Sequence, residues 1–177
     1  MIYYGAKELA ASSRTVRGNT LAIAQDIPED KYDFKVAPGY RSVAQLLTHI
    51  AVAPQFQYQL HATEKRSSFE GVDFPSLMKK LAEEESKSRT KAQIIELLKA
   101  EGEQWASFLD GLSEDFLSQK FTMPEGSTPP FKSRFEMLLS IKEHEMHHRG
   151  QLMTIERVLG IVPHLTRQRE AHMAQTK

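Results

Sequence analysis

The 177-residue sequence contains no cysteine, which excludes disulfide bonds, thiolate metal ligands and a cysteine nucleophile together. It also lacks an excess of either charge, because 23 lysine and arginine residues balance 23 aspartate and glutamate residues. Without a net positive field, nucleic acid and anionic lipid are disfavoured as partners. Any metal ion that this chain binds must therefore be held by histidine and carboxylate side chains.

Long hydrophobic runs are absent as well. No segment reaches the roughly 18 apolar residues of a membrane-spanning helix, and the N-terminal segment lacks the apolar centre of a signal peptide. We therefore expect a cytoplasmic protein with no membrane partner. The length suits a single domain, which we place at residues 1–162, followed by a polar C-terminal tail at residues 163–177.

The alternating pattern of a β-strand is also missing, and apolar residues instead recur at helical spacing in four long segments. These segments cover residues 3–25, 41–62, 90–112 and 133–159. Pro54 lies inside the second segment and predicts a kink or a local break. Residues 63–89 form a polar connection, with room for a short helix, that is long enough to cross the molecule. The pattern predicts an all-α protein, a four-helix bundle.

Histidine is concentrated in one place, because three of the seven histidines lie in the stretch KEHEMHHRGQ at residues 142–151. On a helical wheel His148 falls within about 20° of the centre of the apolar face and His144 within about 60°. His147 falls about 115° away, and Glu145 lies about 45° from the centre on the other side. Two inward imidazoles need partners for their nitrogen atoms, and metal coordination supplies them. Core histidines that hydrogen-bond to backbone or carboxylate groups are the alternative.

A metal site needs a third ligand, and His49 in the second segment is the candidate. On the wheel it lies about 110° from the apolar centre, at the edge of that face, so periodicity leaves its placement open. The other histidines are His61 at a helix end, His164 after a proline and His172 in the tail. We predict these three to be solvated.

The residues from His144 to His148 also spell H-E-x-x-H, the motif of zinc proteases in which the glutamate is the general base. Such enzymes bind peptide along the edge of a β-sheet, and no strand is evident here. The extended form of the motif also needs a further histidine downstream, which is absent at that position. A zinc protease is therefore a minor alternative.

The motif LLTHI at residues 46–50, followed much later by His144 and His148 and at once by Arg-Gly-Gln at residues 149–151, resembles the DinB/YfiT-like superfamily of metal-binding four-helix proteins. The resemblance extends over most of the chain except the C-terminal tail. It implies an up-down-down-up bundle in which His49, His144 and His148 hold a divalent metal ion, while His147 is a neighbour of the site. It also implies a homodimer.

Three histidine ligands leave a coordination position open to water or substrate, which is typical of a catalytic site. Glu145 is the candidate general base, and a solvated helix glutamate is the alternative. The resemblance implies an enzyme that acts on a small-molecule substrate, either a transferase that uses a low-molecular-weight thiol as cosubstrate or a hydrolase. The other class of function is a non-catalytic metal-binding dimeric bundle. Zinc or nickel is expected first, and the same ligands accept iron, cobalt, copper or manganese.

Overall fold

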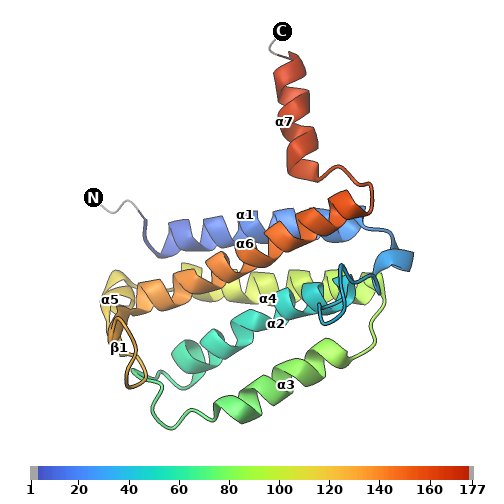
Figure 1. The fold of residues 1–177 in the computed structure, drawn as a ribbon. Helices are drawn as coiled ribbons and strands as arrows, with labels where there is room; N and C mark the ends of the chain where they lie inside the picture. The colour runs from blue at the N-terminus through green and yellow to red at the C-terminus, as the bar shows by residue number, and fades with distance from the viewer. Residues whose placement is uncertain (1–3, 176–177) are drawn as a thin grey trace.

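The computed structural model describes residues 4–175, which form a bundle of four long helices with shorter elements at its ends (Figure 1). The long helices are α1 (Ala6–Asp26), α2 (Val43–Tyr58), α4 (Lys91–Asp110) and α6 (Arg134–Val158). They run up, down, down and up, as predicted (Figure 1). Because α2 and α4 point the same way, the chain must return between them. Helix α3 (Phe74–Ser86) makes this return along the outside of the bundle.

Three of the long helices begin with a capping box, in which a hydroxyl accepts a hydrogen bond from the third helical N–H and the side chain there accepts one in return. The pairs are Ser42 with Gln45, Thr90 with Gln93, and Ser133 with Glu136. These local signals fix where α2, α4 and α6 start.

The core runs along the line where the four helices meet. One fully buried residue from each long helix contributes to the same apolar cluster, namely Ile23, Leu47, Leu98 and Leu152. Burying a side chain of this size stabilises the fold by about 1.5–3 kcal/mol. Leu47 lies two residues before His49, and Leu152 lies one helical turn after His148. The core therefore anchors both helices that carry the candidate ligands.

Pro54 does not break α2, which continues to Tyr58 and then passes into a π-helical turn at Gln59–Thr63. A proline has no N–H, so the carbonyl group four residues earlier loses its helical partner. That carbonyl belongs to Ile50, and it accepts a hydrogen bond from Nη2 of Arg17 at 3.3 Å. A side chain from α1 thus replaces the bond that the proline removes.

The remaining elements lie at the two ends of the bundle. They are the 3-10 turn Glu29–Lys31, the short helix α5 (Glu114–Ser118), the strands β1 (Lys120–Thr122) and β2 (Phe131–Ser133), and α7 (His164–Gln175). The two strands pair antiparallel and were not predicted, because three residues are too few to show an alternating pattern. Helix α7 projects from the bundle in the segment predicted as a polar tail (Figure 1). Among the helices of the described residues, none is long and apolar enough to cross a membrane.

Candidate metal centre

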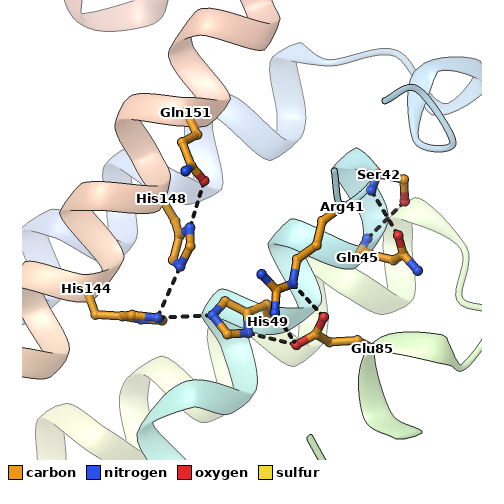
Figure 2. Close-up of polar contacts among 8 residues, drawn as sticks. All are labelled: Arg41, Ser42, Gln45, His49, Glu85, His144, His148 and Gln151. Carbon is orange, nitrogen blue, oxygen red and sulfur yellow. Dashed lines mark hydrogen bonds and ion pairs between the residues drawn. The ribbon is translucent and has the colours of Figure 1, made fainter. Parts of the chain in front are cut away.

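Three histidine side chains from two helices converge at one point inside the bundle (Figure 2). His49 comes from α2, and His144 and His148 come from consecutive turns of α6. Nε2 of His144 lies 3.0 Å from Nε2 of His49 and 3.1 Å from Nε2 of His148. The ligand atoms of the three histidines all lie within 4.8 Å of one another. Within the described residues, this is the group of histidine and acidic side chains that could hold a metal ion.

The spacing of these nitrogen atoms fits a metal ion better than it fits hydrogen bonding among the rings. Three nitrogens on a tetrahedral zinc ion, each about 2.05 Å from the metal, stand about 3.3 Å apart. A neutral imidazole has one donor and one acceptor nitrogen, so three facing Nε2 atoms cannot all be paired with one another. A divalent ion accepts a lone pair from each of them at the same time.

The ring of His49 is held from behind by a carboxylate on α3. Nδ1 of His49 lies 2.8 Å from Oε1 of Glu85, and Arg41 donates hydrogen bonds to both oxygens of the same carboxylate at 2.6 and 3.2 Å (Figure 2). Burial raises the pKa of Glu85, but the bonds from Arg41 and His49 outweigh it and hold that pKa below its ordinary value. Glu85 is therefore an ionised acceptor, which places the proton of His49 on Nδ1 and leaves Nε2 free to bind a metal.

The ring of His148 is oriented in the same way by an amide. Nδ1 of His148 lies 2.8 Å from Oε1 of Gln151, and an amide oxygen can only accept a hydrogen bond. His148 therefore carries its proton on Nδ1 and presents the lone pair of Nε2. The amide nitrogen of Gln151 lies 3.2 Å from Nε2 of His147, which is exposed.

All three rings stay neutral at neutral pH. Burial lowers the pKa of His144 to about 4, with further lowering by the neighbouring histidines. Burial also lowers the pKa of His49 and of His148, although the hydrogen bonds that they donate to Glu85 and Gln151 respectively act to raise it. Neutral imidazole is the form that coordinates a metal, so the site is prepared for binding without the loss of a proton.

Glu145 points inward, as the wheel predicts, but its carboxylate pairs with Arg17 and not with the histidine centre. Its two oxygens accept hydrogen bonds from Nε and Nη2 of Arg17, each at 2.9 Å, and Oε1 also accepts one from Thr20 at 2.7 Å. In the zinc-protease motif the glutamate is free to take a proton from water, and this arrangement does not fit that interpretation. A role of Glu145 as general base stays a prediction, and it requires the pair with Arg17 to open.

Arg17 connects the two helices that carry the ligands. Besides Glu145, next to His144 in α6, its guanidinium donates to the carbonyl of Ile50, next to His49 in α2, and to the carbonyl of Leu98 in α4. The side chain packs over Gly102, where an added Cβ would stand 2.8 Å from Cγ of Arg17. Only glycine leaves room for this crossing.

A pocket of about 820 Å³ lies beside the triad, between α6 and the loop that precedes α2. His148 and Glu85 form part of its wall, which connects the pocket to the histidine centre. Its volume lies within the range of small-molecule sites, about 300–1,000 Å³.

Two of the three histidines predicted to be solvated are buried, which corrects the prediction. His61 is 1% exposed and lies between Gln57 and Arg134, at 2.9 and 2.7 Å. His164 is 5% exposed and contacts Asn19 because α7 starts against α1. His172 is exposed in α7.

Glu85, Arg41 and Arg17 were not predicted from the sequence to take part in the site. Arg17 had a usable signal, because it lies seven residues from Ala10 and from Ala24 on the buried face of α1. A charge at that position needs a buried partner.

Comparison with known proteins agrees with the fold. Residues 13–152 match the family model of the DinB superfamily. The chain belongs to this superfamily. No curated protein matches this DinB chain in a sequence search.

Two solved structures from Bacillus subtilis are similar to this chain of the DinB superfamily. YfiT, described as a probable metal-dependent hydrolase with an unusual four-helix bundle topology, superposes with a TM-score of 0.68 at 15% identity over 91% of each chain. YjoA, described as a DinB-like protein, superposes with a TM-score of 0.63 at 22% identity over 86% of this chain and 92% of its own. At these identities the similarity shows the fold.

Proposed function

We propose that this protein is a metal-dependent hydrolase of small molecules, with a divalent ion held by His49, His144 and His148. The observation that carries the proposal is the convergence of the three Nε2 atoms, with distances of 3.0 and 3.1 Å between neighbours. The description of YfiT as a probable metal-dependent hydrolase supports the same class of activity.

The chemistry of the donors decides what such a site does. Three neutral imidazoles leave the charge of a divalent ion uncompensated, and an ion of this kind lowers the pKa of bound water and polarises a carbonyl oxygen. Glu85 and Gln151 keep the rings of His49 and His148 in the tautomer and orientation that coordination needs. The pocket beside His148 gives a small substrate access to the centre.

The test is turnover of a panel of carboxylic esters and amides by protein loaded with zinc or nickel, with metal content measured in the same samples. We expect hydrolysis by the wild type, its loss in His144→Ala, and its retention in the matched variant His147→Ala. His147 is exposed and stands beside the site, so it controls for the loss of a histidine from the same helix.

The outcomes separate the classes of function. Stoichiometric metal without hydrolysis of any member of the panel would contradict the proposal and favour a non-catalytic metal-binding bundle. Turnover that requires an added low-molecular-weight thiol would instead identify the thiol-dependent transferase that the family resemblance implies.

A further inference from the structure

We infer that the pocket beside the triad binds the neutral, apolar body of a small molecule whose polar end lies at the histidine centre. The pocket is the one lined by Val36, Tyr40, Leu46 and Ile155 together with His148 and Glu85. The position of the polar end rests on the proposed function, whereas the apolar binding surface stands on the pocket alone.

The apolar side chains of this pocket divide into a buried floor and an uncovered rim. Leu46 from α2 and Ile155 from α6 form the floor, and each is 4% exposed. Val36 and Tyr40 form the rim, where they are 41% and 58% exposed. A ligand that enters the pocket would cover apolar surface on both levels, which is the contribution that favours binding.

The polar side chains in the wall already have partners. Arg41 directs Nε and Nη2 to Glu85, so its charge is paired. Gln151 is shared between His148 and His147, and Thr154 donates to the carbonyl of Gly150. Arg41, Gln151 and Thr154 are exposed as well, but each is already bonded within the protein. The apolar surface of Val36 and Tyr40 is therefore what the wall offers, and it suits a neutral aliphatic or aromatic body.

The rim belongs to a loop with a defined conformation. Gly39 has φ of +84°, and the turn that contains it is closed by a hydrogen bond from the N–H of Tyr40 to the carbonyl of Ala37 at 3.2 Å. The base of the loop is tied by the N–H of Val43, which donates to the carbonyl of Phe34 at 3.1 Å. The loop therefore holds Tyr40 at the pocket before any ligand arrives.

The first arm of the test uses metal-free protein and a series of linear aliphatic primary amides of increasing chain length. Binding is followed by NMR of the methyl groups, among which those of Leu46 and Ile155 should shift. We expect the dissociation constant to fall about two- to fourfold for each added methylene, the gain that burial of such a group provides. Equal affinity at all chain lengths would overturn the inference.

Variants of the rim test where the chain binds. Val36→Ser and Tyr40→Ala change exposed residues, so we expect folded proteins in which the gain per methylene is reduced at least by half. Val162→Ser is the matched control, because Val162 is 49% exposed in a loop outside the pocket. An unchanged gain in both rim variants would also overturn the inference.

A second arm separates this inference from the proposed function. Linear aliphatic hydroxamates, which chelate zinc through their polar end, are titrated into zinc-loaded protein by calorimetry. Tight binding that does not depend on chain length would support the metal site and overturn the apolar pocket. A gain with chain length in the amide series, together with no zinc bound, would support the pocket and contradict the proposed function.

Discussion

Arg17 and Glu145 form an ion pair across the buried interface between α1 and α6, with two nitrogen to oxygen distances of 2.9 Å and side chains that are only 7% and 8% exposed. The same guanidinium reaches the carbonyl of Ile50 beside His49. One side chain from α1 therefore contacts both helices that carry the candidate ligands.

Glu145→Ala tests this pair against the general-base prediction. The change leaves the charge of Arg17 buried without a partner, which should lower the free energy of unfolding by about 3–5 kcal/mol. Urea denaturation of metal-free protein measures the effect. A variant of unchanged stability that had lost turnover would contradict a structural role and favour the predicted catalytic one.

Gly102→Ala tests how closely Arg17 must approach α4. An added Cβ would stand 2.8 Å from Cγ and 3.0 Å from Nη1 of Arg17, so the side chain must move. We expect lower stability and weaker metal binding, although alanine favours a helix by about 1 kcal/mol over glycine. Gly18→Ala, where nothing lies within 4 Å, is the control and should be neutral or stabilising. If the two variants had the same stability and metal affinity, the close approach of Arg17 to Gly102 would not matter for the fold or the site.

Glu85→Gln tests the support behind His49. Loss of the carboxylate weakens the bond to Nδ1, and changes of this kind typically lower metal affinity about 10- to 100-fold. Competition with a fluorescent chelator measures the zinc affinity. Glu84→Gln is the control, because the neighbouring Glu84 pairs with Lys87 and Arg89. If both variants bound zinc like the wild type, Glu85 would have no part in the site.

We expect buried Glu156 to make the stability of the protein depend on pH. It is fully buried, neither of its oxygens has a hydrogen-bond partner within the described residues, and burial followed by the nearby Asp26 raises its pKa to about 7. The folded state then holds a proton that the unfolded state releases near the ordinary pKa of 4.5. The associated stability is fully present below that ordinary value and is lost as pH rises through about 7.

Glu156→Gln should remove this loss. We expect it to gain stability relative to the wild type between pH 5 and pH 8, measured by urea denaturation at both values. Glu143→Gln on the exposed side of the same helix is the control. A difference between Glu156→Gln and the wild type that stayed constant over this range would show that Glu156 does not titrate there.

The sequence predicted the parts of the site that depend on periodicity within one helix. His148 and Glu145 were placed inward from the apolar stripe of α6, and the structure confirms that both are buried. His49 lay at the edge of its stripe, so only the family resemblance placed it at the centre. Its membership in the triad as a ligand stays a prediction until metal is measured.

Periodicity within one helix does not predict contacts between segments that are far apart in the chain. Glu85 comes from the crossing helix α3, in which no residue is buried, and Arg41 precedes the cap of α2. The prediction that His61 and His164 are solvated was wrong for a related reason. A helix end and a position after proline are exposed only when no other segment packs over them. Here β1 brings Phe121 against His61, and α1 lies against His164. The homodimer that the resemblance implies stays a prediction.

The three-histidine centre can be tested by the metal content of untagged protein, measured by inductively coupled plasma mass spectrometry for the wild type and single alanine variants. We predict one divalent ion per chain in the wild type, its loss in the His49, His144 and His148 variants, and its retention in His147→Ala. A wild type that takes up no metal after addition of zinc and nickel, or a His49→Ala variant that keeps its metal, would contradict the three-histidine centre.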